Sequence, residues 1–331
     1  MVGERSRAAA VIVGAGIAGL SAAWELDRRG QGDTWVLEAE SQPGGVVQTC
    51  AEAGFQMEAG PDSFLTAKPA AAELCAELGL AGERIGTLPS PGAQIYHRGQ
   101  LRPLPGGWRL AAPTRLGPLL RSPLLSPGVK AQLALRWRSA PAAPRAEESA
   151  AAYLRRRFGT RAGQALAETV AGPLLAGVYG GDVEQLAAAE VRGGDTGRSD
   201  RGPATAPAHL TTFTSLRGGM ATLVQALAEQ LPAGSVRLNC RATAVNAAEG
   251  GFRITLAPDQ TVETARLILA GPAWAAAELV CGLDTELAAN LAAIPYTSSV
   301  NVNVAYACAP ELPPGHGCLV SRREGRRLLA C

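Results

Sequence analysis

The hydrophobic pattern near the N-terminus predicts strands and helices in alternation. Residues 8–13 form an uninterrupted apolar run, which is typical of a strand buried on both faces. Apolar side chains then recur at helical spacing over residues 17–29, and a second short apolar run ends at Leu37. Residues 46–57 alternate imperfectly around a turn at 52–54, which predicts a hairpin. Residues 69–78 predict a helix that ends at Gly79.

The pattern changes between Pro89 and Pro144, where Pro, Gly, Leu and Arg are frequent. We expect this stretch to form a lobe that does not continue the first sheet, because only short helical segments are predicted in it. The helices predicted for this lobe and the residues that follow are 116–120, 129–137, 147–158 and 162–170. The polar segment 192–209 predicts a disordered loop.

Regular elements return after residue 211. We expect order over residues 211–219, followed by a helix that carries Leu223, Leu227 and Leu231 on one face. Strands are predicted at residues 236–239, 252–256 and 267–270. Pro272 is expected in the first turn of the next helix. A last strand is predicted from the alternation of Val300, Val302, Val304 and Tyr306 with Asn301 and Asn303.

Three glycines between the first strand and the first helix indicate a dinucleotide site. Gly14 permits a tight turn, Gly16 lets the backbone approach a pyrophosphate, and Gly19 lets the helix pack close to the strand. The helix that begins at Ile17 and Ala18 would aim its free N–H groups at the phosphates. Glu38 ends the second strand, where its carboxylate would accept ribose hydroxyls and repel a 2′-phosphate, which argues against NADP.

A second glycine pair, Gly44-Gly45, follows soon after Glu38 and favours FAD, because such a pair resembles the FAD-dependent amine oxidase and desaturase superfamily. The predicted fold is therefore α/β: a discontinuous Rossmann-like FAD-binding domain with an inserted, mainly helical lobe and a mixed α+β substrate domain. The expected boundaries are 1–88 and 211–285 for the two parts of the FAD-binding domain, 89–210 for the inserted lobe, and 286–331 for an incomplete substrate domain.

Composition narrows the functional classes. The 331 residues are 47% hydrophobic, which suffices for two connected domains, and the net charge of +2 gives no electrostatic case for nucleic acid. The seven cysteines form no metal-ligand spacing with the three histidines, so we expect reduced thiols, no metal and a cytoplasmic protein. We expect neither a signal peptide nor a membrane-spanning helix, since the chain passes directly into the first strand and no apolar run approaches about 18 residues.

Three further blocks carry a family resemblance. They are the segment GPDSFL at residues 60–65 with Lys68-Pro69, the segment GVYGGD at 177–182, and the segment SLRGGM at 215–220. With the glycine turn, they make the chain resemble the oxygen-dependent porphyrinogen oxidases of haem biosynthesis from Ala8 to its last residue. Within that family, GPDSFL followed by KP is similar to the bacterial branch that oxidises coproporphyrinogen III. The mitochondrial protoporphyrinogen enzymes usually carry Arg at the position of Asp62.

The resemblance implies removal of six electrons from a porphyrinogen by FAD, with O2 as acceptor and hydrogen peroxide as product. Catalysis would centre on the flavin, with Asp62, Lys68, Val178 and Tyr179 facing the substrate. A solvated lysine and a simple glycine-rich turn are the structural alternatives for Lys68 and for residues 177–182. The residues expected to contact the cofactor are Gly14, Gly16, Ile17, Ala18, Gly19, Glu38, Ala39, Gly44, Gly45, Gly60, Pro61, Arg217, Gly218, Gly219, Val236 and Ala270.

Two departures from the family stand out. Gln42 occupies a position where many relatives carry a pyrophosphate-binding Arg. Relatives also continue past Cys331 with strands and a second flavin contact, so we expect an unpaired strand near residues 328–331 and weak oxidase activity. An amine oxidase, a carotenoid-type desaturase and an inactive FAD-binding remnant are the alternatives. Substrate preference between coproporphyrinogen III and protoporphyrinogen IX, oligomeric state and peripheral contact with the inner membrane face stay open.

Overall fold

A computed structural model describes residues 6–66, 68–87, 92–109, 112–138, 143–191, 213–308, 310–311, 313, 315 and 317–331. The chain divides into two compact units, each described here by itself. Unit 1 comprises Met1–Thr87, Arg201–Tyr296 and Val300–Ala305, and unit 2 comprises Leu88–Asp200, Thr297–Ser299 and Tyr306–Cys331. The loop predicted at residues 192–209 lies outside the described residues.

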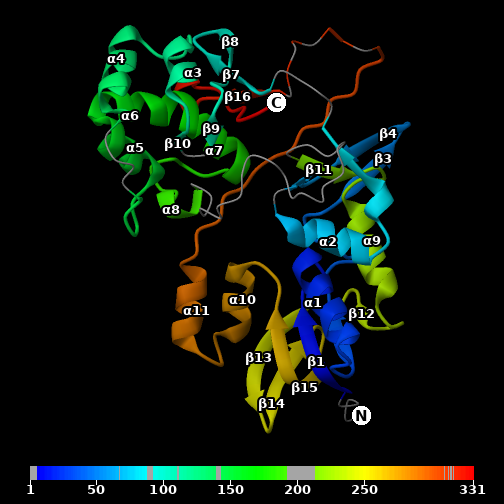
Figure 1. Cartoon of the computed structure of the whole chain (residues 1–331). Coiled ribbons are helices and arrows are strands. Elements are labelled where there is room, and N and C mark those ends of the chain that lie inside the picture. The colour runs from blue at the N-terminus through cyan, green and yellow to red at the C-terminus, as the bar shows by residue number, and fades with distance from the viewer. Residues whose placement is uncertain are drawn as a thin grey trace. The chain divides into compact units, whose positions relative to one another are not determined.

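Unit 1 is built on a six-stranded sheet of order β12-β2-β1-β15-β14-β13 (Figure 1). The strands are β1 (Ser6–Val13), β2 (Thr34–Leu37), β12 (Val236–Arg237), β13 (Ala242–Ala248), β14 (Gly251–Leu256) and β15 (Gln260–Leu269). The first four strands in this order run parallel. β13, β14 and β15 follow one another in the chain as antiparallel neighbours, and β15 pairs with β1 in the middle of the sheet. The predicted α/β fold is therefore confirmed.

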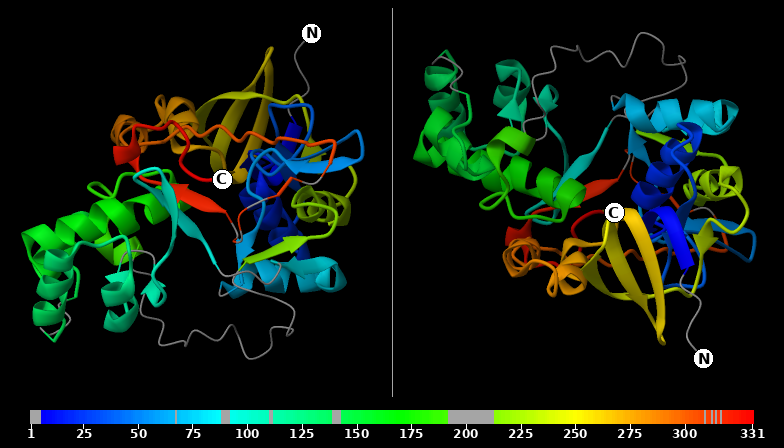
Figure 2. Two further views of the ribbon diagram at one scale, coloured as in Figure 1. Left: turned by 90° about the horizontal axis from the view of Figure 1, so that it is seen from above. Right: turned by 90° about the horizontal axis from the view of Figure 1, so that it is seen from below.

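Helices cover this sheet because its strands bury apolar side chains on both faces. Ile12 and Val36 pack with Leu20 of α1 (Ile17–Arg28) and with Leu227 of α9 (Ala221–Gln230). On the opposite face, Val11 and Leu37 belong to a cluster with Ile254 and Val262. Helix α10 (Ala273–Val280) contacts β13, and α11 (Thr285–Ala292) follows it. Figure 2 shows β1 and β15 side by side in the middle of this unit.

The remaining elements of unit 1 surround the strand ends. They are the hairpin β3 (Thr49–Glu52) and β4 (Phe55–Glu58), the sheet of β5 (Phe64–Leu65), β11 (Phe213–Leu216) and β6 (Arg84–Gly86), helix α2 (Pro69–Glu77) and the short 3-10 helix η1 (Ala81–Glu83). The predicted hairpin is confirmed: Ala53 and Gly54 both have positive φ, at 50° and 81°, as a tight two-residue turn requires. Helix α2 ends as predicted, with Gly79 at φ 77°.

In unit 1, one strand was not predicted and three predictions need correction. Strand β13 was missed because only Val245 of its seven residues is buried. Strand β15 begins at Gln260, earlier than the predicted residue 267. Pro272 is the N-cap of α10 and precedes its first turn. The alternating residues 300–306 form no regular strand, since a period-two pattern becomes a strand only when a neighbour supplies the hydrogen bonds; Val300 is 88% exposed.

Unit 2 combines a helical cluster with a small sheet. Its helices are α3 (Leu116–Arg121), α4 (Pro127–Arg136), α5 (Ala150–Phe158), α6 (Thr160–Leu166), the π-helical turn η2 (Ala167–Ala171), α7 (Gly172–Tyr179), α8 (Ala188–Val191) and the 3-10 turn η3 (Arg322–Glu324). Its strands are β7 (Gln94–His97), β8 (Gln100–Pro103), β9 (Trp108–Arg109), β10 (Ala112–Pro113) and β16 (Cys318–Val320). Tyr153, Leu154, Phe158 and Leu166 are fully buried in its core.

Unit 2 differs from expectation at the start of α5 and near Cys331. Helix α5 begins at Ala150, three residues later than predicted, because Glu147 has a left-handed φ of 63° and Ser149 caps the helix by accepting a hydrogen bond from the Ala152 N–H. The segment near Cys331 does have a neighbour: the Cys318 N–H donates to the Cys331 carbonyl at 2.7 Å, and the reverse bond is 2.9 Å. The expectation of an unpaired strand at residues 328–331 was therefore wrong.

Candidate cofactor site

The turn between β1 and α1 has a shape that only glycine permits. Gly14 has a φ of 106°, and its N–H donates to the Leu37 carbonyl at 2.8 Å. A Cβ on Gly14 would lie 3.3 Å from backbone atoms of Ala270 and Gly271. A Cβ on Gly19 would lie 1.9 Å from the Gly14 carbonyl oxygen, so the helix touches the turn directly. The spacing of these glycines thus fixes how α1 packs against the sheet.

The N-terminus of α1 is open and lacks a side-chain cap. Gly16 is the N-cap with extended backbone, and the first turn carries no acidic residue. A Cβ built on Gly16 meets no atom within 4 Å, so space lies beside the helix end. Helices α5 and α11, in contrast, are capped by Ser149 and Asp284. The first N–H groups of α1 and its positive dipole end can therefore receive an anion, and Ile17 and Ala18 belong to this turn.

Glu38 stands at the end of β2 with its carboxylate already oriented. Its Oε2 accepts a 2.7 Å hydrogen bond from the Ala15 N–H, and its Oε1 accepts one of 2.9 Å from the Glu40 N–H. The Glu38 backbone is fixed on both sides, by the Arg237 carbonyl and the Cys240 N–H. A carboxylate has about four acceptor positions, so two remain for hydroxyl donors such as those of a ribose. The next residue, Ala39, is half-buried.

The second glycine pair lies directly beside the first turn. The Gly44 N–H donates to the Ala15 carbonyl at 2.8 Å, and Gly44 forms a parallel bridge with Gly16. Gly44 and Gly45 have φ values of 119° and 58°, and a Cβ on Gly45 would lie 3.5 Å from the Gly16 Cα. Residues almost thirty positions apart therefore form one continuous glycine surface. Gln42, two residues earlier, is exposed.

Other predicted cofactor residues border the same strand ends. A Cβ on Gly60 would lie 1.8 Å from the Val46 carbonyl oxygen, so Gly60 packs against the residue that follows the glycine pair, and Pro61 is exposed. Val236 pairs with Val36 in the sheet. The Ala270 N–H donates to the Val13 carbonyl at 2.8 Å.

A hydrogen-bond cluster that sequence reasoning missed holds the turn at residues 217–219. Glu58 Oε1 accepts from the Met220 N–H at 2.9 Å, and Glu58 Oε2 accepts from the Thr49 hydroxyl at 2.9 Å. Thr49 Oγ1 in turn accepts from the Ala221 N–H at 3.0 Å. Gly219 has a φ of 87°, and a Cβ on it would lie 2.4 Å from Thr49. The hairpin register that pairs Thr49 with Glu58 creates this cluster, and no local motif reveals it.

Arg217 and Gly218 are exposed at the same turn, and the Arg217 N–H donates to the Glu83 carbonyl. A Cβ on Gly218 would lie 2.7 Å from the hydroxyl of Thr222, which leaves little room for a side chain. This turn thus presents backbone and one guanidinium group to solvent.

The two candidate substrate residues in unit 1 are both exposed. The Asp62 carboxylate accepts from the Ser63 hydroxyl at 2.8 Å, and the Asp62 carbonyl accepts from the Ser215 hydroxyl at 2.7 Å. Lys68 is the N-cap residue of α2 and forms no ion pair with any residue that the structure describes. No hydrogen bond or ion pair joins Asp62 to Lys68, so the Lys68 ammonium group is not neutralised by this carboxylate.

The two candidates in unit 2 form the end of α7. Val178 and Tyr179 are 47% and 44% exposed, and Gly180 ends the helix with a φ of 64°. The segment 177–182 is therefore half helix and half turn. Asp182, at its end, forms an ion pair of 3.2 Å with Arg322 and accepts from the Glu184 N–H.

The glycine surface, the open helix end and the oriented carboxylate define a nucleotide-binding α/β protein. The family comparison specifies which one: the chain belongs to the flavin-containing amine oxidoreductases, whose match spans residues 17–327. The cofactor is accordingly a flavin, in agreement with the prediction of FAD.

Three relatives illustrate the likeness. The chain is 29% identical to the coproporphyrinogen III oxidase of Propionibacterium freudenreichii, over 89% of this chain and 63% of the relative. It is 28% identical to the enzyme of the same name from Bacillus subtilis, over 97% of this chain and 72% of the relative. A crystal structure from Exiguobacterium sp. 255-15, provisionally named protoporphyrinogen oxidase, superposes with a TM-score of 0.75 at 25% identity, over 99% of this chain and 72% of that one.

The chain thus spans 63–72% of the length of these three proteins. In the part of the chain that the structure describes, no helix has both the length and the apolar character needed to cross a membrane.

Proposed function

We propose that the protein oxidises a porphyrinogen to a porphyrin with FAD and O2, releasing hydrogen peroxide, as a step of haem biosynthesis. The observation that carries this proposal is the alignment of relatives named coproporphyrinogen III oxidase along 89% and 97% of the chain. The GPDSFL and GVYGGD segments, which favour a porphyrinogen oxidase over an amine oxidase or a desaturase, fall inside that alignment.

The residues of unit 1 suit the cofactor. Gly16 and Gly45 would lie against the pyrophosphate, where the N–H groups of α1 supply donors and a side chain would intrude. The two acceptor positions left on Glu38 would bind the ribose hydroxyls, and its negative charge would repel a 2′-phosphate. FAD, when bound, supplies the capacity to take a hydride from the substrate and to be reoxidised by O2.

The turn at Arg217-Gly218-Gly219 would position the reacting end of the cofactor. The cluster of Thr49 and Glu58 holds the N–H groups of Met220 and Ala221, the two residues that follow this turn, so the end of the turn is fixed before any ligand binds. Gly60 and Pro61 would complete the surface at that end.

The proposed substrate is a macrocycle of four pyrroles joined by methylene bridges, with carboxylate arms, of which coproporphyrinogen III carries four. Lys68 is exposed and has no carboxylate partner among the described residues, so its ammonium group is available to a propionate. The Asp62 carboxylate can accept a hydrogen bond from a pyrrole N–H. Val178 and Tyr179 offer exposed apolar surface, which suits the face of a macrocycle.

The test is anaerobic single turnover of the FAD-loaded chain. Mixing with coproporphyrinogen III is expected to bleach the flavin absorbance and to yield fluorescent porphyrin after air is admitted. Lys68→Met should raise the KM for coproporphyrinogen III without changing the FAD content. A charge that binds the ground state and the transition state equally affects KM more than kcat. Lys130→Met, at the only other lysine of the sequence, is the matched control.

Each alternative has its own signature in the same experiment. Bleaching by primary amines, with none by porphyrinogens, would identify an amine oxidase. Flavin binding without bleaching by either would identify an FAD-binding remnant. A comparison of coproporphyrinogen III with protoporphyrinogen IX would decide the preferred substrate.

A further inference from the structure

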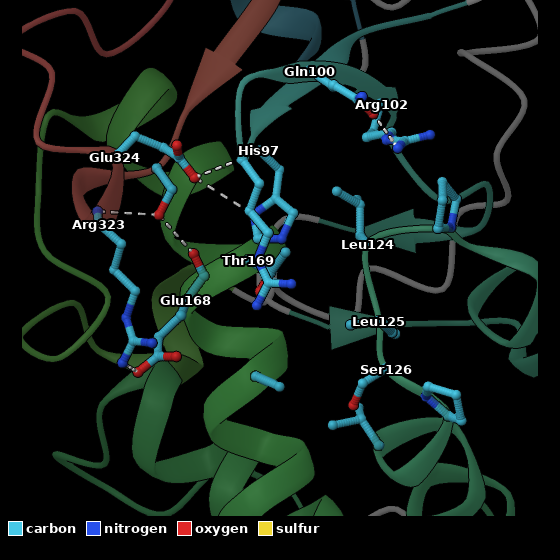
Figure 3. A pocket seen from close by; sticks show the side chains of 16 residues that line it. His97, Gln100, Arg102, Leu124, Leu125, Ser126, Glu168, Thr169, Arg323 and Glu324 are labelled. Carbon is cyan, nitrogen blue, oxygen red and sulfur yellow. Dashed lines mark hydrogen bonds and ion pairs between the residues drawn. The ribbon is translucent and has the colours of Figure 1, made fainter.

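Unit 2 contains a cavity of about 600 Å³ that none of the predicted cofactor or substrate residues lines. The β7–β8 hairpin forms one wall, the residues around the start of α4 form a second, and η2 and η3 close the remainder (Figure 3). Leu124, Leu125 and Val129 supply apolar surface. The ionisable side chains that line the cavity are His97, Arg98, Arg102, Glu168, Arg323 and Glu324.

The two carboxylates of this cavity are already engaged. Glu168 forms an ion pair with Arg323, and its carbonyl accepts from the Ser321 hydroxyl at 3.0 Å. Glu324 Oε1 accepts from the Arg98 backbone N–H at 3.0 Å and lies 3.6 Å from His97 Nδ1 (Figure 3). Both carboxylates are therefore oriented by groups other than the guanidinium groups of Arg98 and Arg102.

Those two guanidinium groups have no carboxylate partner among the described residues. Arg102 Nη2 donates to the amide oxygen of Gln100, which leaves its other donors available. Burial, followed by the positive charge of Arg98, lowers the pKa of His97, while Glu324 acts in the opposite direction. The cavity thus holds an excess of positive charge. A guanidinium carries five N–H donors, and on Arg102 one of them is used by Gln100.

The backbone at Arg98 adds an independent observation. Arg98 and Gly99 have φ values of 51° and 79° and form the two-residue turn that joins β7 to β8. The first position of such a turn favours Asn, Asp or Gly, because a left-handed φ strains other side chains. A long cationic side chain that lines a cavity from a backbone position that disfavours it indicates a role for the side chain itself.

We propose that this cavity binds a small oxyanion ligand, with two neighbouring carboxylate or phosphate groups held by Arg98 and Arg102. Guanidinium groups bind both kinds of oxyanion in a bidentate manner, and the volume accommodates a small organic acid or a short polyphosphate. The proposal concerns residues of unit 2 alone and does not depend on the proposed oxidase activity.

The test uses the FAD-loaded chain, so that the open end of α1 does not compete for anions. Sodium pyrophosphate and sodium citrate are titrated separately by calorimetry, with sodium chloride keeping the ionic strength constant. We expect saturable binding of at least one of them at about one equivalent, weakened about tenfold or more by Arg98→Gln and by Arg102→Gln. This factor corresponds to loss of a charged hydrogen bond. Whichever anion binds more tightly identifies the phosphate or the carboxylate class.

Two further variants separate binding from folding. Arg121→Gln removes the same charge at an exposed residue of α3 outside the cavity and should leave the affinity unchanged. Glu324→Gln keeps an acceptor for the Arg98 N–H but removes a negative charge, so it should tighten anion binding.

Opposite effects at Arg98 and Glu324 cannot arise from general destabilisation. If Arg98→Gln fails to fold, Arg98→Lys preserves the charge and should retain part of the affinity. Absence of saturable binding in the parent chain, or equal affinities in the parent, the arginine variants and the control, would overturn the proposal.

Discussion

The glycines at positions 16 and 19 give the sharpest test of the cofactor site, because alanine is expected to act on different properties at the two positions. A Cβ at Gly19 would lie 1.9 Å from the Gly14 carbonyl oxygen, whereas a Cβ at Gly16 meets nothing within 4 Å. Real Cβ contacts are not shorter than 3.0 Å, so Gly19→Ala forces α1 and the turn apart by about 1 Å.

The expected magnitudes follow from this geometry. Overpacking of backbone against backbone in Gly19→Ala should destabilise the apo chain by about 3 kcal/mol. In Gly16→Ala, the poorer N-cap costs up to about 1 kcal/mol, and the reduced freedom of the unfolded chain offsets about 0.4–1 kcal/mol of it. The stability of Gly16→Ala should therefore change little. Its FAD affinity should fall roughly 10- to 150-fold, because the added Cβ would occupy the space of the pyrophosphate and separate it from a helix N–H group. The loss of one such charged hydrogen bond is worth about 1.5–3 kcal/mol.

Urea unfolding of the apo chain and titration with FAD by flavin fluorescence measure the two properties separately. Equal destabilisation by Gly16→Ala and Gly19→Ala would contradict the claim that the space beside Gly16 is open. Unchanged FAD affinity in a folded Gly16→Ala chain would show that the pyrophosphate does not lie at this turn.

Three other variants test the site and the stability of unit 2. Glu38→Ala should weaken FAD binding at least tenfold in the same titration, because two acceptor positions for ribose hydroxyls disappear; unchanged affinity would remove Glu38 from the site. Phe158→Ala should destabilise unit 2 by about 3–5 kcal/mol in thermal unfolding, since Phe158 is fully buried and stacks on Trp137; a change below about 1 kcal/mol would contradict this packing. Hydrogen bonds from Arg156 hold the pKa of Glu148 below its ordinary value of 4.5, so this pair stabilises the fold above that pH and the stability is lost as the pH falls below it. Glu148→Gln should therefore lower the free energy of unfolding at pH 7 and reduce its loss at acid pH. Glu77→Gln, at an exposed carboxylate, should do neither. Parallel pH profiles for the two variants would be contrary to this account.

The sequence predicted those elements whose signal is local. The apolar run of β1, the glycines that follow it and the hairpin turn at Ala53-Gly54 each satisfy a requirement of the backbone at that place. Glu38 was predicted at the site from its spacing to Gly14, and Gly44 from the family resemblance. In the structure both form hydrogen bonds with the Ala15 backbone.

Elements that depend on distant partners were not predictable in this way. Strand β13 buries only Val245, so its identity as a strand comes from pairing with β14 and not from its own pattern. At residues 300–306 a strand was predicted that does not form. The residues alternate between apolar and polar, but no described strand pairs with them.

The cluster of Thr49 and Glu58 requires both the hairpin register and a helix start more than 160 residues later. The cationic cavity of unit 2 likewise joins the β7–β8 hairpin to η3, segments that no motif links.

The most direct test of the central claim is reduction of the bound flavin by substrate in the absence of oxygen. The FAD-loaded chain is mixed with coproporphyrinogen III, and flavin absorbance is followed over a single turnover. The account predicts bleaching that needs higher substrate concentrations in Lys68→Met than in the parent chain and in Lys130→Met, with porphyrin fluorescence after air is admitted. A flavin that stays oxidised with porphyrinogens but is bleached by primary amines would contradict it.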